Sequence, residues 1–446
     1  MINKGNNMKN PEITLQTVNN MRKRLNEIDA ESLARKCGIS KRKNRKLNAN
    51  QLLSILVAMA PSSFFSLEKT AKLAGLHCNI KFSKQAMSKR LSGGIDKFLI
   101  EVATKLLHPL IVRAPSAKSA LGLFLRVLVV DSTIIPLPDR FSTSFPGSAN
   151  KSKSTSAMKL QVVMDILNLN VPHLGISSFR RNDQAASPDI LEIAKPGDLV
   201  LRDLGYFVLE TFSKMIDNGI YFISRYRHGT LLFSQDNQQQ LNLYETLKRQ
   251  GFIDQKVLLG KEQRLPVRLV AVPVPEDVAN KRRRKAKRDR DKRCNPSKEK
   301  LFMMGWTILI TNVEPEKLTS KTIDQIYRLR WTIEILFKAW KTHLKLHLPN
   351  TASKDAILAS IASKLIFCVL TQRFHAVIEL CSSQEKHASI LRVANVVADL
   401  SIILVCIFLK INIIDMATHM IESHAFYETR KDRINMQQQI HTLCLG

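Results

Sequence analysis

Closely spaced cysteines, long apolar runs and acidic residues are all scarce in this sequence. Its seven cysteines include no CxxC pair, which argues against a disulfide framework or a zinc site. The N-terminal residues MINKGNNMKNPEITL lack the apolar core of a secretory signal. The most apolar stretch, Leu400 to Leu409, has about ten residues, whereas a membrane-spanning helix needs roughly 20. We therefore expect a cytoplasmic protein without a membrane partner, in which this stretch is a buried helix.

The excess of basic over acidic residues is the main feature of the composition. Lys and Arg number 68 against 38 Asp and Glu, a formal net charge of +30 with a pI near 10.0. This charge indicates a polyanionic partner, and nucleic acid is the leading candidate. A generally basic proteome or an anionic lipid surface would also explain it. The 446 residues, 45% of them hydrophobic, are enough for two or three domains.

Residues 1–115 are predicted to form a helical N-terminal DNA-binding region, because apolar residues recur there with helical periodicity. Within it, the segments 66–76 and 83–91 are predicted to be two short helices that each begin at a serine. The second would present Lys84, Gln85, Ser88, Lys89 and Arg90. A helix-turn-helix and an ordinary helical hairpin with a solvated basic face explain this pattern equally well.

From Leu123 onward the pattern changes to short apolar runs that predict strands at 123–131, 158–166 and 171–177. A hairpin is expected around 167–170, followed by a helix at 188–194 and by strand, sharp turn and helix from 198. We predict a mixed α/β core over 120–215 and 312–350, a mainly β insertion at 216–311 and a helical C-terminal region at 351–446. The insertion contains KRRRKAKRDRDKR (281–293), which either contacts a DNA backbone, the favoured alternative, or is a disordered loop.

Two aspartates follow apolar runs that predict buried strands. Asp131 comes after Val127 to Val130, and Asp203 comes shortly after Leu199 to Leu201. Either one alone could simply end a strand, but carboxylates that converge from different segments are what two-metal phosphodiester cleavage requires. The pair therefore indicates a metal-dependent nuclease-type site.

The segment IYRLRWTIEILFKAWKTHLKLH (326–347) is predicted to be one amphipathic helix, because it has helical periodicity and no Gly or Pro. At about 100° per residue, Tyr327, Arg330, Glu334 and Lys341 would lie on one edge of it, about 60° wide. Arg330 and Glu334 also form an i,i+4 pair of the kind that decorates solvated helices, but that interpretation leaves Tyr327 and Lys341 unexplained.

The spacing Y-x2-R-x3-E-x6-K of these four residues resembles the YREK signature of bacterial insertion-sequence transposases of the DDE type. The segments VVDST (129–133) and LVLRDLGYF (199–207) resemble the first and second catalytic aspartate segments of that family, in the expected order. The resemblance implies a ribonuclease-H-like core with a β insertion between the second aspartate and the glutamate.

The resemblance also implies roles for individual residues. Asp131, Asp203 and Glu334 would be the catalytic metal ligands for Mg²⁺, with Mn²⁺ as a substitute. Tyr327 and Arg330 would contact phosphates at the DNA end, and Lys341 would hold the terminal phosphate. Trp306, on the predicted strand GWTILITN, resembles the family tryptophan that stacks on a flipped base, although a core tryptophan is nearly as good an interpretation.

The function implied is a DNA transposase that cuts transposon ends and joins their 3′-hydroxyl groups to target DNA. Its partners would be double-stranded DNA, both the terminal inverted repeats and the target, and a second copy of the chain in a synaptic homodimer. A nuclease without strand transfer would share the same three carboxylates. A decayed, purely DNA-binding relative would keep the charge but should have lost some of them.

Overall fold

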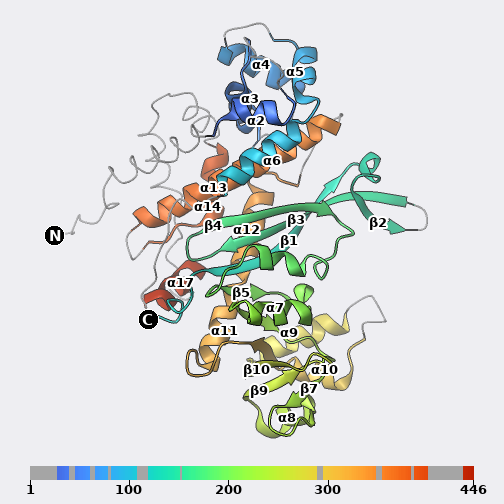
Figure 1. The fold of residues 1–446 in the computed structure, drawn as a ribbon, viewed down its shortest axis with the longest axis vertical. Helices are drawn as coiled ribbons and strands as arrows, with labels where there is room; N and C mark the ends of the chain where they lie inside the picture. Colours follow the sequence, from blue (N-terminus) through green and yellow to red (C-terminus); the bar gives the residue numbers. More distant parts are fainter. Residues whose placement is uncertain are drawn as a thin grey trace, which may run out of the picture. The chain divides into compact units, whose positions relative to one another are not determined.

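The computed structural model describes residues 28–39, 46–60, 66–78, 82–107, 119–150, 153–288, 295–347, 354–382, 386–399 and 435–445. The predicted buried helix at Leu400 to Leu409 lies outside these residues. The chain divides into two compact units (Figure 1). Unit 1 comprises residues 1–113, 132–180 and 333–439, and unit 2 comprises residues 114–131, 181–332 and 440–446. Each unit is described by itself.

Helices make up much of unit 1, as the sequence predicts for the regions that flank the sheet. The long helix α13 packs against α6, α3, α5 and α14, and α4 packs against α5. The helices are α2 (Ala30–Lys36), α3 (Ala49–Met59), α4 (Leu67–Cys78), α5 (Lys84–Leu91), α6 (Ile95–Leu106), α13 (Lys354–Cys381) and α14 (Ile390–Asp399). At the C-terminus, α17 (Met436–Leu445) spans the boundary between the units.

The two predicted helices of the N-terminal region are present as α4 and α5. The hydroxyl of Ser83 accepts a hydrogen bond from the amide of Ala86 at 3.1 Å, which is the N-cap that the sequence predicts. Met87 and Leu91 of α5 are buried, whereas Lys84, Gln85, Ser88 and Lys89 are exposed. Arg90 is half-buried and its guanidinium donates to the carbonyl of Leu47. Arg90 therefore anchors the helix, while its neighbours form a polar outer face.

One helix, α13, is long and apolar enough by length and composition to cross a membrane, over Asp355 to Glu379. Within the structure, 89% of its most apolar window is buried. A core helix passes the same test, because burial inside a protein selects the same apolar composition.

The sheet of unit 1 is built from long antiparallel strands. Strand β3 (Lys153–Asp165) pairs with three strands: β2 (Pro146–Asn150), β4 (Asn170–Ser178) and β1 (Val127–Leu137). The second half of β1 belongs to unit 1. The 3₁₀ helix η1 (Asp139–Phe141) follows β1. The predicted hairpin joins β3 to β4. Its turn is held by the buried Asp165, which accepts from the Leu167 amide at 3.1 Å and the Asn168 side chain at 2.6 Å.

Unit 2 contains the first half of β1 and the strand order β1-β5-β6-β11-β10-β9-β7-β8. Strands β1, β5 (Leu199–Arg202) and β6 (Tyr221–Arg225) are parallel, and their central residues are fully buried, as continuous apolar runs predict. The other strands are β7 (Leu232–Ser234), β8 (Gln240–Leu241), β9 (Ile253–Leu259), β10 (Leu265–Pro273) and β11 (Trp306–Thr311). The pairings among β6, β11, β10, β9, β7 and β8 are antiparallel.

Helices in unit 2 connect these strands. They are η2 (Ser187–Glu192), η3 (Leu204–Tyr206), α7 (Leu209–Asp217), α8 (Leu243–Gln250), α9 (Glu276–Lys287), α10 (Lys298–Met303) and α11 (Ser320–Arg328). Helix α12 (Trp331–Thr342) begins in unit 2 and continues in unit 1. The predicted fold class, a mixed α/β sheet with a strand-rich insertion and helical flanks, is confirmed.

Four local predictions need correction. The strand predicted at 123–131 runs instead from Val127 to Leu137, because residues 119–124 form turns and bends, so Asp131 lies within β1 and not at its end. The helix predicted at 188–194 is the 3₁₀ helix η2. Of the two alternatives for the basic run 281–293, the disordered loop is wrong through Lys287, because the run is helical that far.

The fourth correction concerns the segment 326–347, which is not one helix. Helix α11 ends at Arg328, and α12 begins at Trp331. Between them the amide of Arg330 bonds to the Tyr327 carbonyl at 3.1 Å, an i→i−3 bond that tightens the turn. The helical wheel therefore does not extend across residues 329–330, because tertiary contacts of Tyr327 and Arg330 override the apolar periodicity.

Candidate active site

The two aspartates lie at equivalent positions on adjacent parallel strands. In the register of β1 and β5, Val129 is opposite Leu201 and Val130 is opposite Arg202. The next pair along is therefore Asp131, within β1, and Asp203, the residue after β5. Adjacent strands are about 4.8 Å apart, and residues in register point to the same face of a sheet. The two apolar strands therefore position both carboxylates beside each other on one face of the sheet.

Arg330 connects these two carboxylates. Its Nη1 lies 3.8 Å from Oδ2 of Asp131, and its Nε lies 3.9 Å from Oδ1 of Asp203. The arginine side chain is only 7% exposed, whereas that of Asp203 is 40% exposed. One buried cation is therefore shared by two carboxylates that remain accessible from outside.

Tyr327 fixes the strand that carries Asp203. Its hydroxyl donates a hydrogen bond to the carbonyl of Arg202 at 3.3 Å. The side chain is buried, and this burial raises the pKa of Tyr327 to about 12. Tyr327 is therefore a neutral hydrogen-bond donor at physiological pH. Its predicted contact with DNA phosphates stays a prediction, whereas its contact with β5 is direct.

Glu334 and Lys341 lie on the part of α12 that belongs to unit 1. Glu334 is in the first turn and Lys341 in the last turn, so the helix separates them by seven residues. Lys341 is half-buried, and burial lowers its pKa. Among the residues that the structure describes, no group of three or more His, Cys, Asp or Glu side chains is arranged to hold a metal ion. The roles assigned to Glu334 and Lys341 stay predictions.

Trp306 lies in the insertion, at the start of β11. Its Nε1 donates to the carbonyl of Gly251 at 2.6 Å, and its ring lies 4.8 Å from that of Phe302. These contacts fit the alternative in which Trp306 is a packed tryptophan. Its stacking on a DNA base stays a prediction.

Two residues near the aspartates were missed by the sequence reasoning. In the register of β5 and β6, Arg202 is opposite Ser224, so Arg225 is the next residue level with Asp203. Arg225 is exposed, and its charge acts on the pKa of Tyr327. Trp331, directly after Arg330, is 50% exposed, and the Arg330 guanidinium lies 5.3 Å from its ring centroid. The run YFISR marks Arg225 as the last residue of a strand, but only the register with β5 brings it level with Asp203.

Helix α9 divides the basic run into two faces. On the inner face, Arg282 donates to the Trp306 carbonyl at 3.0 Å and Arg283 donates to the Leu301 carbonyl at 3.1 Å. Burial, and then the charge of Arg225, lowers the pKa of Arg282. The outer face consists of five exposed cations, Lys281, Arg284, Lys285, Lys287 and Arg288. Half-buried arginines therefore anchor the helix while the other cations face solvent.

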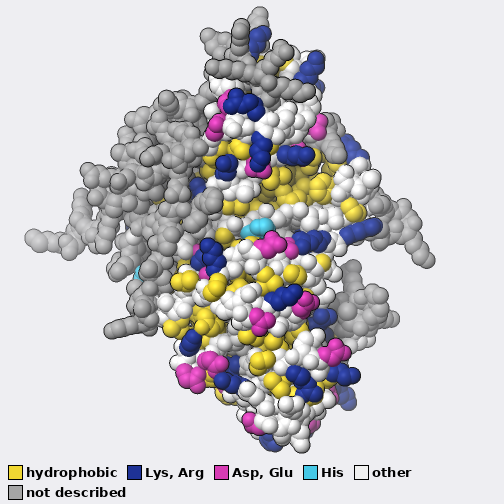
Figure 2. All heavy atoms as spheres, in the orientation of Figure 1, with side chains coloured by type: hydrophobic (Ala, Val, Ile, Leu, Met, Phe, Trp, Pro, Cys, Tyr) yellow, Lys and Arg dark blue, Asp and Glu magenta, His cyan; other side chains and the backbone are white. Residues whose placement is uncertain are grey.

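Basic side chains elsewhere are dispersed. On the face of the molecule shown in Figure 2, Lys and Arg are interspersed with acidic and apolar side chains and form no single patch. On that face the basic side chains are spread among others, whereas the outer face of α9 is a local concentration of positive charge.

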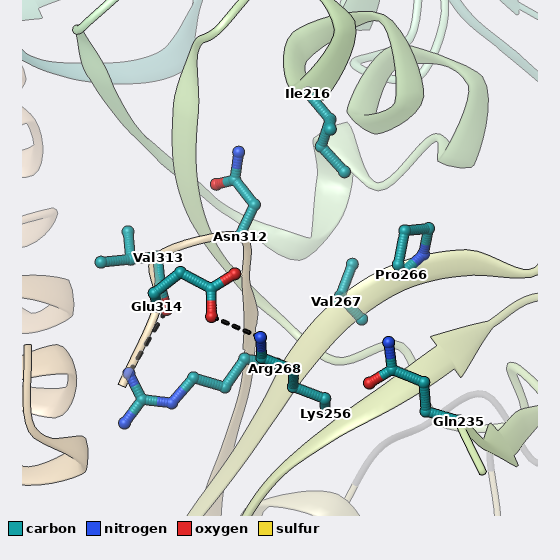
Figure 3. A pocket seen from close by; sticks show the side chains of 9 residues that line it. All are labelled: Ile216, Gln235, Lys256, Pro266, Val267, Arg268, Asn312, Val313 and Glu314. Carbon is teal, nitrogen blue, oxygen red and sulfur yellow. Dashed lines mark hydrogen bonds and ion pairs between the residues drawn. The ribbon is translucent and has the colours of Figure 1, made fainter. Parts of the chain in front are cut away.

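A pocket of about 230 Å³ in unit 2 lies away from the aspartates (Figure 3). Its polar side chains are already engaged. Lys256 and Glu314 form an ion pair at 2.7 Å, and the side chain of Asn312 bonds to the main chain of Phe222 and Ile220. Arg268 is held by Asp254 and by two carbonyl groups. A ligand in this pocket would therefore have to compete with existing hydrogen bonds and ion pairs for these polar side chains. Its lining residues are Ile216, Gln235, Lys256, Pro266, Val267, Arg268, Asn312, Val313 and Glu314.

Sequence comparisons find relatives of this chain among transposases. The transposase for insertion sequence element IS231C of Bacillus thuringiensis subsp. berliner is 29% identical over 358 residues, which cover 75% of this chain and 74% of the relative. The transposase for insertion sequence element IS1151 of Clostridium perfringens is 25% identical over 309 residues, 65% of each chain. A solved piggyBac transposase synaptic complex with hairpin DNA aligns with a TM-score of 0.44 at 9% identity, over 96% of this chain and 84% of that one.

A family model described as "Transposase DDE domain" matches residues 122–370. The matched segment is more than half of the 446 residues and contains both aspartates together with Tyr327, Arg330 and Glu334. The chain therefore belongs to the family of transposases with a DDE domain.

Proposed function

We propose that this DDE transposase hydrolyses DNA at the ends of an insertion sequence and joins the freed ends to target DNA. In the first step a water oxygen bonds to phosphorus, and the bond to the 3′ oxygen breaks, which leaves a 3′-hydroxyl and a 5′-phosphate. In the second step that 3′-hydroxyl attacks a target phosphodiester and displaces its 3′ oxygen. Both steps are in-line phosphoryl transfers.

The observation that carries this proposal is the register of β1 and β5. It puts Asp131, which lies within β1, beside Asp203, which directly follows β5, with Arg330 within 4 Å of each. The buried parallel strands are a rigid support, so the positions of the two carboxylates are well defined. A purely DNA-binding protein has no need for two adjacent carboxylates, which repel phosphate.

The residues present fit a divalent ion of the kind that the family uses. Hard carboxylate oxygens suit Mg²⁺, and the exposure of Asp203 leaves a path for it. We assign Asp131, Asp203 and Glu334 as the residues that would hold it, with Mn²⁺ as a substitute. When bound, the ion would polarise the phosphoryl oxygens and activate water. The nearby charge of Arg330 limits the repulsion between Asp131 and Asp203.

We assign basic residues to the binding of the DNA end. Arg330 and Arg225 offer planar guanidinium groups that match phosphate oxygens, and the flexible Lys341 offers a compact charge. Arg225 is level with Asp203 on the neighbouring strand, so a phosphate near that carboxylate could be held from the side. Tyr327 holds the Arg202 carbonyl and so supports the same strand end.

Double-stranded DNA is the partner that the outer face of α9 fits. Lys281 and Lys285, and Arg284 and Arg288, are like charges at i,i+4, an arrangement that is destabilising for a free helix. A phosphate backbone would relieve this repulsion without reading sequence. We assign terminal inverted repeats and target DNA as substrates, a homodimer as the active assembly and the bacterial cytoplasm as its location.

The experiment that tests the proposal uses a labelled duplex that carries the terminal inverted repeats of the element, with Mg²⁺. Wild-type protein should cut this duplex and join its 3′-hydroxyl end to a second DNA. Glu334→Ala should abolish both steps and leave DNA binding intact. Cleavage that survives in Glu334→Ala would remove this residue from the site.

The matched control is Glu299→Ala, which removes an exposed carboxylate from α10 in the insertion and should leave both steps unchanged. Wild-type protein that cuts but never joins a second DNA would be a nuclease. Wild-type protein that binds without cutting would be a DNA-binding relative, and either result would overturn the proposal.

A further inference from the structure

Arg202 is a fully buried arginine directly before Asp203. Its side chain is 0% exposed, and within the described parts of the chain no Asp or Glu side chain pairs with it. In the same parts, its Nε has no hydrogen-bond partner. Burial lowers the pKa of Arg202 to about 10, so the guanidinium stays protonated at neutral pH. A buried cation without a carboxylate is unusual, because desolvation penalises it.

The contacts of Arg202 lie on the face of the sheet opposite to Asp203, because consecutive strand residues alternate. Its Nη2 donates to the carbonyl and to the hydroxyl of Ser187, at 2.9 and 2.8 Å. Its Cζ lies 5.5 Å from the ring centroid of Tyr206 and 5.6 Å from that of Phe212. Two aromatic faces and a carbonyl thus replace the missing carboxylate.

These contacts tie down the main chain on both sides of Asp203. The Ser187 hydroxyl donates to the carbonyl of Tyr206 at 3.0 Å, and Tyr206 ends the 3₁₀ helix η3, for which Asp203 is the N-cap residue. On the other side, the carbonyl of Arg202 accepts the bond from Tyr327. Hydrogen bonds therefore fix both ends of the segment 202–206. Arg202 is held through its side chain and through its carbonyl, and Tyr206 is held through its carbonyl.

We infer that Arg202 is a positioning residue, which keeps the Asp203 carboxylate level with that of Asp131 for divalent-ion binding. This inference rests on the proposed function. An unbranched apolar side chain would fill the same space with a smaller desolvation penalty, so stability alone does not explain an arginine here. A rigid anchor under the second metal ligand does, because loosely supported ligands bind ions more weakly.

The test compares Arg202→Met with wild type and with Arg268→Met. Arg268 is the matched control, because it is also a buried arginine of unit 2 but lies on β10 in the insertion and bonds to Asp254. The unfolding temperature of each full-length protein is measured across a Mn²⁺ titration, and cleavage of the end duplex is measured over the same Mn²⁺ range. Arg202→Lys is included as the conservative variant.

For Arg202→Met we expect an increase of about tenfold in the Mn²⁺ concentration at half-maximal stabilisation and at half-maximal cleavage. At saturating Mn²⁺ its cleavage rate should return to near the wild-type rate. Arg202→Lys should shift less. Arg268→Met should unfold at a lower temperature and keep the wild-type Mn²⁺ midpoints.

The inference would be overturned if Arg202→Met reached half-maximal stabilisation and cleavage at the same Mn²⁺ concentration as wild type. It would also be overturned if Arg268→Met showed the same increase in that concentration as Arg202→Met. If Arg202→Met does not fold, the midpoint of Arg202→Lys decides in the same way. Wild-type protein that neither responds to Mn²⁺ nor cuts DNA would overturn the proposed function and this inference with it. If wild-type protein responds to Mn²⁺ and cuts DNA but the Arg202 variants keep the wild-type Mn²⁺ midpoints, only the inference about Arg202 would be overturned.

Discussion

Two regions of unit 2 bring an arginine to carboxylate groups, and they do so differently. In the insertion, Arg268 bonds to both oxygens of Asp254 at 2.6 and 2.7 Å and also donates to the Leu318 carbonyl at 2.7 Å. At the candidate active site, Arg330 approaches one oxygen of each of two aspartates, at 3.8 and 3.9 Å. The first pair is a closed bidentate contact. The second is a looser arrangement around one cation.

The difference shows how the same residue types serve stability in one place and chemistry in another. A bidentate pair saturates both partners, so neither can take up a ligand without breaking it. The contacts of Arg330 with Asp131 and Asp203, at 3.8 and 3.9 Å, are longer than those of a bidentate pair, so a divalent ion can displace them more easily. We therefore expect substitutions in the insertion pair to affect folding and substitutions at the candidate active site to affect catalysis.

Asp203→Asn should give the largest effect, because an amide keeps the shape of the side chain but removes its charge. We expect cleavage to fall by at least about 10³-fold, since a lost metal ligand removes several kcal/mol of transition-state stabilisation. The unfolding temperature should change little. The measurement is the single-turnover cleavage rate of the end duplex, together with thermal unfolding.

The matched substitution Asp254→Asn should behave in the opposite way. It leaves the buried guanidinium of Arg268 without a countercharge and should lower the free energy of unfolding by about 3 kcal/mol. The cleavage rate per folded molecule should equal that of wild type. If Asp254→Asn instead lost cleavage while fully folded, the distinction between the two regions would be wrong.

Arg330→Lys should give an intermediate effect on catalysis. A lysine ammonium cannot reach both aspartates and a phosphate with the planar fork of an arginine. We expect kcat/KM to fall by roughly 10²-fold, or about 2.7 kcal/mol, with little change in stability. Steady-state kinetics of Arg330→Lys beside Arg268→Lys test this. A larger kinetic loss for Arg268→Lys would contradict the expectation.

The outer face of α9 should give the smallest effect on chemistry and a clear one on salt dependence. Replacing Arg284, Lys285 and Lys287 by alanine should reduce the slope of log affinity against log salt by up to about 3, if each contacts a phosphate. The cleavage rate at saturating DNA should be unchanged. The measurement is duplex binding by fluorescence anisotropy from low to moderate salt.

The control for α9 removes the same charge from Lys248, Arg249 and Lys261, which are also exposed cations of the insertion. This variant should keep a slope close to that of wild type. Equal losses in the two triple variants would mean that net charge, and not this helix face, determines binding.

Much of the fold class could be predicted from local pattern. The runs before Asp131 and Asp203 are strands because they are continuous and apolar, and the hairpin at 167–170 follows from its turn residues. Both depend on short-range chemistry that a single sequence displays. The helix break at residues 329–330 could not be predicted, because it serves contacts to residues more than 100 positions away.

The candidate site was predicted only in part for the same reason. The apolar runs predict Asp131 and Asp203, the motif spacing predicts Arg330, and the structure brings the three together. Arg225 was missed because its significance depends on the register between β5 and β6, which no local pattern specifies. Trp306 was chosen by resemblance, but its bond to Gly251 comes from a loop 55 residues earlier.

The sequence by itself determined that an aspartate follows each of two buried apolar runs, that a Tyr-Arg-Glu-Lys motif follows them and that the protein carries a large positive charge. These properties depend on residue type and spacing, which are local. Only the tertiary structure decided that Arg330 is shared by two aspartates, that Arg202 is buried beneath the second, and which cations of α9 face solvent. Such properties depend on strand register and on burial, and both arise only when segments distant in the chain pack together.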